Sequence, residues 1–130
     1  MRPARGLHHV ALTVSDLDAS IAWYRAVFGL EEVLREQSDP RRAAVLTFPG
    51  TQMAVGLVEH AAGASHGFDA TRIGLDHVAF SVGTREELDE WAGALQDHGI
   101  DHSGVIEVAV GAILNFKDPD GIALAFFWDS

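Results

Sequence analysis

The 130-residue sequence contains no cysteine, which excludes disulfides, thiolate metal sites and cysteine nucleophiles. Basic side chains are also scarce, because 9 Lys and Arg stand against 19 Asp and Glu and give a net charge of −10 with neutral histidines. Such a charge repels phosphates, so we expect no nucleic-acid partner. No apolar run approaches the ~20 residues of a membrane helix, and the N-terminus lacks the apolar stretch of a signal peptide. We therefore expect a cytoplasmic protein with no membrane partner.

An internal repeat is the strongest positive signal. The segment His9–Val14 (HVALTV) matches His77–Val82 (HVAFSV) at an offset of 68 residues. Each copy is followed by a polar break, a stretch with helical spacing, and then Gly29-Leu30 or Gly99-Ile100. With 48% hydrophobic and 22% charged residues the chain has a globular composition. We infer two copies of one supersecondary unit.

Within each copy, the apolar period changes from two residues to about 3.6. The first copy predicts a strand over 9–14 and a helix over about 18–28 that ends at Gly29. The second predicts a strand over 77–82 and a helix that starts with the capping box Thr84–Glu87 and ends before Gly99. Three further strands follow each helix, predicted over 31–37, 43–48 and 52–59, and over 104–109, 111–117 and 122–128.

The predicted fold class is α+β, with two tandem βαβββ modules in one domain, 1–130. Module one covers about 7–59, a linker covers 60–74, and module two covers about 75–128. The strongly apolar side chains of each first strand belong against the helix, so the alternate side chains point away from it. We expect the two mixed sheets to form an open, barrel-like concave groove that suits a small-molecule ligand or substrate.

Four segments carry a family resemblance, namely Leu7–Val14, Ser20–Leu30, Leu75–Phe80 and the turn Asp118–Gly121 (DPDG) before a final apolar strand. In these segments the chain resembles the vicinal oxygen chelate superfamily, which includes glyoxalase I, extradiol dioxygenases, fosfomycin-resistance enzymes and bleomycin-resistance proteins. The resemblance covers residues 7 to 128 and implies a fold that hosts several chemistries.

The resemblance also implies a divalent metal, bound by one residue from the first strand and one from the last strand of each module. The first-strand positions fall on His9 and His77. The last-strand positions fall on Gly56 and Ala125, which have no donor atom. The predicted site is therefore a non-standard pair of histidines that binds Fe, Mn, Ni, Co or Zn, with no organic cofactor and with its catalytic residues unassigned. A metal-free groove is the alternative, because stable sites usually supply three or four protein ligands.

The predicted lining of the groove comprises nine side chains, namely Ala11, Thr13, Gly56, Ala79, Ser81, His102, Asn115, Ala125 and Phe127. Glu107 is a further candidate near the groove, whereas alternation puts Glu59 on the opposite face from Gly56. His60 and His66 are expected to be solvated linker residues.

Two functions remain open from the sequence. The matched histidines favour a metal-assisted lyase, isomerase or oxygenase, which is the working prediction. Without the carboxylates, standard glyoxalase I isomerisation and extradiol ring cleavage are both disfavoured. The absence of the carboxylates favours a metal-free protein that binds a drug or metabolite, as bleomycin-resistance proteins do. A partner subunit with a vestigial groove is a third hypothesis. Because open sheets expose edge strands, we expect a homodimer.

Overall fold

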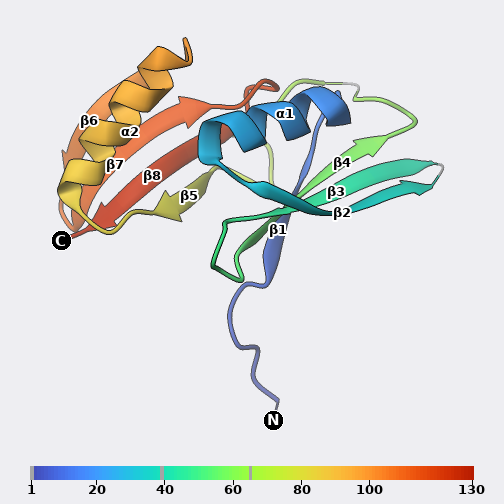
Figure 1. The fold of residues 1–130 in the computed structure, drawn as a ribbon, viewed down its shortest axis with the longest axis horizontal. Coiled ribbons are helices and arrows are strands. Elements are labelled where there is room, and N and C mark those ends of the chain that lie inside the picture. The colour runs from blue at the N-terminus through green and yellow to red at the C-terminus, as the bar shows by residue number, and fades with distance from the viewer. Residues whose placement is uncertain (1, 39, 65) are drawn as a thin grey trace. The chain divides into compact units, whose positions relative to one another are not determined.

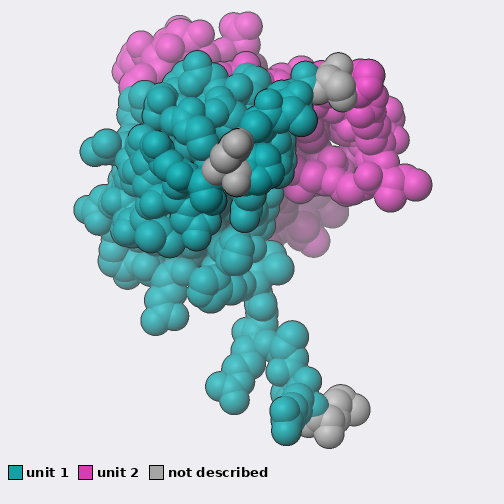
Figure 2. Space-filling model, turned by 90° about the vertical axis from the view of Figure 1, so that its right-hand side faces the viewer, with its two compact units in different colours: residues 1–65 teal, residues 66–130 magenta. Residues whose placement is uncertain are grey.

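The computed structural model describes residues 2–38, 40–64 and 66–130, which form two compact units, 1–65 and 66–130 (Figure 2). Each unit has the same order of elements along the chain. Unit 1 contains β1 (His9–Thr13), α1 (Leu17–Phe28), β2 (Glu31–Ser38), β3 (Arg41–Thr47) and β4 (Ala54–His60). Unit 2 contains β5 (Val78–Ser81), α2 (Arg85–Asp97), β6 (His102–Val108), β7 (Gly111–Lys117) and β8 (Ala123–Asp129).

Each unit is a four-stranded mixed sheet with one helix packed against it (Figure 1). The strand orders are β1-β4-β3-β2 and β5-β8-β7-β6, so the first strand pairs with the last. That pairing is parallel in both sheets, and the other pairings are antiparallel. The predicted α+β class and the two βαβββ modules are confirmed.

The element boundaries differ from the prediction at two informative places. His60 is the last residue of β4 and pairs with Arg41, although we predicted that it begins the linker. β6 begins at His102, two residues before the predicted start, and its pairing with β7 shifts between His102 and Val105. Gly104, with φ of 72°, lies inside that shift, and a glycine inside a strand pattern is typical of a bulge.

Helix α1 is defined at both ends by local hydrogen bonds. Asp16 caps the N-terminus by accepting a hydrogen bond from the Ala19 N–H at 3.0 Å. Gly29 ends the helix in the left-handed conformation, φ of 70°, and donates its N–H to the Arg25 carbonyl. The predicted inward residues are all buried, namely Ile21, Tyr24, Val27 and Phe28. This stripe forms the core of unit 1 together with the buried leucines of β3 and β4.

Helix α2 begins with the predicted capping box, in which Thr84 and Glu87 each accept a hydrogen bond from the other's backbone N–H. Leu88 and Leu95 are fully buried, and Trp91 stacks on Phe126 of β8 with 4.1 Å between ring centroids. Phe116 also stacks on Phe126, with 5.2 Å between ring centroids. Among the described residues, neither helix is long and apolar enough to cross a membrane.

The turn before β8 explains why the DPDG sequence is a reliable marker. Asp118 is buried, 6% exposed, and its carboxylate accepts hydrogen bonds from the Asp120 and Ile122 N–H groups, both at 2.9 Å. Gly121 adopts φ of 78°, which favours glycine, and donates its N–H to the Asp118 carbonyl at 2.9 Å. One aspartate therefore fixes the direction in which the chain enters β8.

Candidate functional site

The two candidate ligands occupy equivalent places in the two units. His9 is the first residue of β1 and His77 immediately precedes β5. Along each strand the burial alternates, with Leu12 and Phe80 buried and the side chains on either side of them exposed. His9 and His77 therefore belong to the face of each sheet that is turned away from its helix, which we call the distal face.

The last-strand positions are equivalent as well. Gly56 of β4 pairs with Ala11, and Ala125 of β8 pairs with Ala79, so both lie on the distal face two residues beyond the histidine. Neither position offers a metal ligand. At Gly56 even a Cβ atom would lie 3.2 Å from the Ala11 Cβ, tighter than ordinary van der Waals contact. Ala11 would have to move by a few tenths of an ångström to admit any side chain at Gly56.

Each candidate ligand contacts the residue before it through the same ring nitrogen. His77 Nδ1 lies 2.7 Å from Asp76 Oδ1, and His9 Nδ1 lies 2.9 Å from His8 Nδ1. Within the described residues, neither Nε2 atom makes a hydrogen bond, so each is available to bind a metal ion or a small molecule. The sequence shows that a polar residue precedes each histidine, but it gives no side-chain rotamer, and we did not predict these contacts.

The remaining candidates divide between the two faces of sheet β5-β8-β7-β6. Asn115 pairs with Ala125 and is exposed, while Phe127 pairs with Ser81 and is half-buried, so both lie on the distal face. His102 instead pairs with Phe116, a core residue on the α2 side, and its Nδ1 accepts a hydrogen bond from the Gly104 N–H at 2.9 Å. The expected groove position of His102 is therefore corrected, because the register of β6 turns it to the helix side.

Glu107 belongs to the helix side too, where its carboxylate accepts hydrogen bonds from the Arg85 guanidinium of α2 at 2.6 and 2.8 Å. The ion pair with Glu107 holds the pKa of Arg85 above its ordinary value. Both groups of this contact have a partner, and neither can reach the distal face of the sheet. Glu107 therefore does not supply the missing carboxylate.

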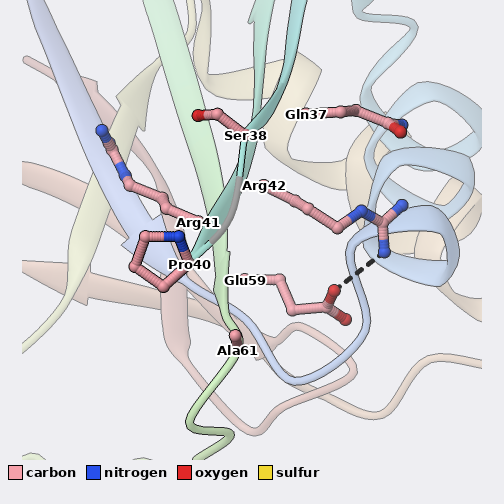
Figure 3. Close-up of a pocket in the computed structure, with 7 residues that line it drawn as sticks. All are labelled: Gln37, Ser38, Pro40, Arg41, Arg42, Glu59 and Ala61. Carbon is pink, nitrogen blue, oxygen red and sulfur yellow. Dashed lines mark hydrogen bonds and ion pairs between the residues drawn. The ribbon is translucent and has the colours of Figure 1, made fainter.

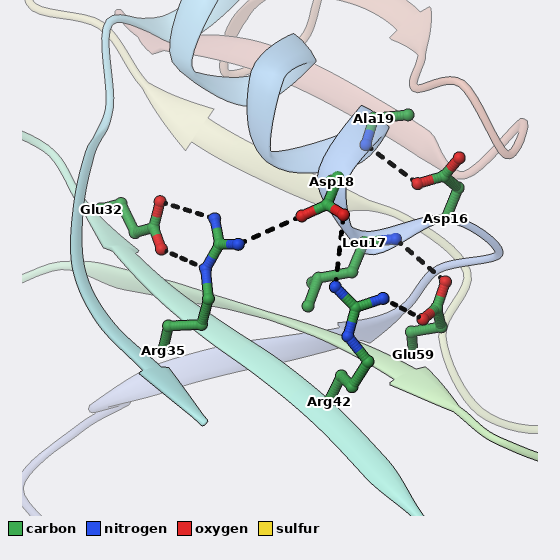
Figure 4. Close-up of polar contacts among 8 residues, drawn as sticks. All are labelled: Asp16, Leu17, Asp18, Ala19, Glu32, Arg35, Arg42 and Glu59. Atoms are coloured by element: carbon green, nitrogen blue, oxygen red, sulfur yellow. Dashed lines mark hydrogen bonds and ion pairs between the residues drawn. The ribbon is translucent and has the colours of Figure 1, made fainter. Parts of the chain in front are cut away.

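Glu59 has a structural task on the helix side of unit 1, as alternation predicted (Figure 4). One carboxylate oxygen accepts the Leu17 N–H at 3.2 Å, and the other accepts a hydrogen bond from Arg42 at 2.8 Å. Asp18 of α1 pairs in turn with Arg42 at 3.3 Å and with Arg35 at 3.1 Å. These contacts attach the first turn of α1 to three strands, and they leave Glu59 unable to serve as a metal ligand.

The described residues contain no group of three or more His, Asp or Glu side chains that could hold a metal ion. A closed structural site, which needs four protein ligands, does not fit this donor set. In each unit, taken by itself, one imidazole with an unoccupied Nε2 atom is a donor of the kind that suits a borderline divalent ion.

A hollow of about 720 Å³ lies on the distal face of unit 1. It is bounded by the segment Arg5–His8, by Gln52–Ala54 and by Val45 and Thr47 of β3. Ala54 is the pairing partner of His9, so the hollow adjoins the candidate ligand. Its volume falls within the range of about 300–1,000 Å³ that is typical of small-molecule sites, and Leu7, Val45 and Met53 give it an apolar lining.

A second hollow, of about 230 Å³, lies at the end of the β2–β3 hairpin (Figure 3). Arg42 and Glu59 line it and already pair with each other, while Arg41 points away from both. Arg41 pairs with His60 at the opposite end of β4 from Ala54. This hollow is therefore remote from His9, and its charges are largely satisfied, so the first hollow is the better candidate site.

Comparison with known proteins gives one family and several relatives. Residues 6–126 match the model of the Glyoxalase/Bleomycin resistance protein/Dioxygenase superfamily. A curated relative, the "Putative ring-cleaving dioxygenase MhqA" of Bacillus subtilis, is 30% identical over an alignment of 124 residues that covers 91% of this chain. The chain spans only 38% of that relative's length.

Solved structures agree on the fold. The glyoxylase/bleomycin resistance protein/dioxygenase domain from Frankia sp. EAN1pec is 37% identical, with a TM-score of 0.91 over 98% of this chain and 100% of that chain. The fosfomycin resistance protein FosX from Listeria monocytogenes is 21% identical, with a TM-score of 0.75 over 98% of this chain and 94% of that chain. At that identity FosX shows the likeness of fold alone.

Proposed function

Because the chain belongs to the Glyoxalase/Bleomycin resistance protein/Dioxygenase superfamily, we propose that it is a metal-assisted enzyme of the lyase, isomerase or oxygenase class. Its substrate is a small molecule, and its metal is a divalent Fe, Mn, Ni, Co or Zn ion. His9 and His77 are the two protein ligands. The positions that carboxylates occupy in the standard sites, Gly56 and Ala125, leave coordination places for oxygens of the substrate.

One observation carries the proposal, namely that His9 and His77 hold equivalent positions on the two distal faces and each keep Nε2 free of hydrogen bonds among the described residues. Packing does not explain this arrangement, since both side chains are exposed. A bound divalent ion acts as a Lewis acid that polarises an oxygen of the substrate. The chain's own part is to orient the two imidazoles and, through Leu7, Val45 and Met53, to bind the apolar portion of the substrate.

The two missing carboxylates narrow the chemistry. In a glyoxalase-type isomerisation a glutamate would also move the substrate proton, and neither Gly56 nor Ala125 can do so. A two-histidine, one-carboxylate site is typical of non-haem iron oxygenases, and the described residues offer no third ligand. The relative MhqA is described as a putative ring-cleaving dioxygenase, which keeps the oxygenase class within the proposal, with an oxygen-bearing substrate completing the coordination of the metal.

A metal-free binding protein for a drug or metabolite is the second candidate. The number of metal ligands favours this candidate, because the described residues supply no third one. The apolar hollow of unit 1 can also hold a small molecule without a metal. In this function His9, which adjoins the hollow through its pairing partner Ala54, would donate or accept hydrogen bonds at the edge of the ligand site.

Elemental analysis of the purified protein by plasma mass spectrometry separates the two candidates. The protein is compared with His9→Ala/His77→Ala and with the matched control His60→Ala/His66→Ala, which removes two other exposed histidines. We expect near-stoichiometric metal in the wild type and the control, and none in the first variant. A wild type that stays metal-free after soaking with each ion, alone and with a chelating oxygen ligand, would contradict the metal-assisted function and favour the metal-free one.

A further inference from the structure

The contact between Asp76 and His77 fixes more than the direction of a side chain. A carboxylate has no proton to give, so at 2.7 Å the Nδ1–H of His77 must be the donor and Asp76 Oδ1 the acceptor. A neutral imidazole carries one proton only. With that proton on Nδ1, the Nε2 atom bears a lone pair, which is the form in which histidine ligates a metal.

We infer that Asp76 is a positioning residue, which holds His77 in the Nδ1–H tautomer. The Nε2 atom of His77 is then better prepared to bind a divalent ion than the Nε2 atom of His9. The part of the inference that concerns a divalent ion rests on the proposed function. The tautomer itself is a property of the metal-free protein and can be observed whether or not a metal binds.

The equivalent contact in unit 1 has a different chemistry. His8 Nδ1 lies 2.9 Å from His9 Nδ1, and the two rings meet edge to face with 5.1 Å between centroids. Either imidazole can supply the proton of this hydrogen bond, so His8 does not select one tautomer of His9 as a carboxylate does. The two halves of the proposed site are therefore unequal, and His77 is its pre-organised half.

Unit 2 contains a natural internal control in a second Asp-His pair, Asp101-His102. There the aspartate is not the partner, because His102 Nδ1 accepts the Gly104 N–H at 2.9 Å. His102 must therefore carry its proton on Nε2 when neutral. The same Asp-His sequence thus has opposite tautomers at His77 and His102. The difference comes from the hydrogen-bond partner of each Nδ1 atom, which only the structure shows.

The test is long-range ¹H–¹⁵N correlation NMR of the imidazole rings in metal-free protein, at a pH where both rings are neutral. We expect an unprotonated Nε2 at His77 and an unprotonated Nδ1 at His102. Asp76→Ala should shift His77 toward the Nε2–H tautomer, Asp76→Asn should preserve part of the preference because its amide oxygen still accepts, and Asp101→Ala should change neither ring. An Nε2–H tautomer at His77 in the wild type, or no response to Asp76→Ala, would overturn the inference.

Titration of the same proteins with Mn²⁺, Co²⁺ and Zn²⁺ supplies the second readout. Loss of a group that orients a ligand costs about 10- to 100-fold in metal affinity, and we expect about 10-fold for Asp76→Ala because the Asp76 side chain is 75% exposed. Unchanged affinity would overturn the role of Asp76 toward the metal. If the wild type binds no metal at all while the tautomers are as stated, the proposed function fails and the assignment of the tautomer to Asp76 stands.

Discussion

Gly111, at the start of β7, is the glycine of unit 2 at which an added Cβ atom would come closest to another atom. Its φ is 156°, and a Cβ atom at this position would lie 1.8 Å from the Trp128 carbonyl oxygen of β8. No rotamer relieves such an overlap, because the backbone alone fixes where Cβ lies and the carbonyl oxygen that it meets is itself a backbone atom. The pairing of β7 with β8 must therefore separate locally to admit any other residue.

We predict that Gly111→Ala destabilises the protein by about 3 kcal/mol, at the upper end of the cost of overpacking. The matched control is Gly93→Ala, since Gly93 lies inside α2 with nothing within 4 Å of its Cβ position. Alanine there should be neutral or stabilise by up to about 1 kcal/mol, because it lowers the entropy lost on helix formation. Urea unfolding followed by circular dichroism measures both, and equal stabilities would contradict the prediction.

Glu32 carries a pH dependence of stability. Its hydrogen bonds to Arg35, at 2.6 and 3.0 Å, hold the pKa of the Glu32 carboxyl below its ordinary value. A carboxyl whose pKa is depressed in the folded state stabilises that state above its unfolded pKa, and the contribution is lost as the pH falls through the folded pKa.

We therefore predict that the stability difference between the wild type and Glu32→Gln is largest near neutral pH and shrinks on acidification. Urea midpoints across a series of acidic buffers measure it. Because this ion pair lies near the surface, the difference should also shrink in high salt. A difference that stays constant with pH would show that the carboxyl titrates alike in both states.

At the scale of elements, the first turn of α1 depends on a residue more than forty positions away in the sequence. Glu59 accepts the Leu17 N–H and pairs with Arg42, so it satisfies a free helix N–H and fixes a guanidinium together. We predict that Glu59→Ala costs about 1–2 kcal/mol in the free energy of unfolding. Glu59→Gln should cost less, because an amide oxygen can still accept the Leu17 N–H.

The control for this prediction is Glu90→Ala, which removes an exposed carboxylate from α2. It should change the stability by less than about 0.5 kcal/mol. Chemical unfolding of all four proteins gives the comparison. If Glu59→Ala unfolds with the same midpoint as Glu90→Ala, then α1 does not depend on this contact.

The elements themselves were predictable because their signals are local. Alternation over 9–14 and 77–82, the capping box at Thr84 and the glycine after each helix all depend on neighbours within a few residues, and each predicted element is present. The face on which Glu59 lies also followed from alternation. Alternation could not give the register shift between His102 and Val105, and that shift is why His102 lies on the helix side and not in the predicted groove.

The site was predictable only in part for a similar reason. The repeat and the family resemblance selected His9 and His77, but the contacts of their Nδ1 atoms depend on rotamers and on the path of the chain before each strand. The partners of Glu107 and Glu59, Arg85 and Arg42, come from other elements. The first pairing requires the packing of α2 on its sheet and the second requires the register of β3 on β4, and no local pattern contains either.

At the scale of the whole molecule, each sheet has a long outer strand with exposed apolar side chains. β2 exposes Val33 and Leu34, each 56% accessible, and β6 exposes Ile106 and Val108. Unprotected edge strands of this kind pair with other chains. We therefore keep the homodimer as a prediction, and expect light scattering after size-exclusion chromatography to give twice the 14.0 kDa of one chain. A mass of 14.0 kDa at micromolar concentration would contradict it.

The position of the last strand in each sheet bears on how the protein is made on the ribosome. β4 and β8 are the last strands of their units in the sequence but lie inside the sheets, each between the first strand and the third. While a nascent chain emerges, the first strand of a unit has no neighbouring strand until about 45 residues later. Unit 1 can complete its sheet once residue 60 has left the exit tunnel, whereas unit 2 must wait for residue 129. Until β8 emerges, the apolar sides of β5 and α2 are accessible to chaperones. Slow translation between α2 and β8 would prolong their exposure.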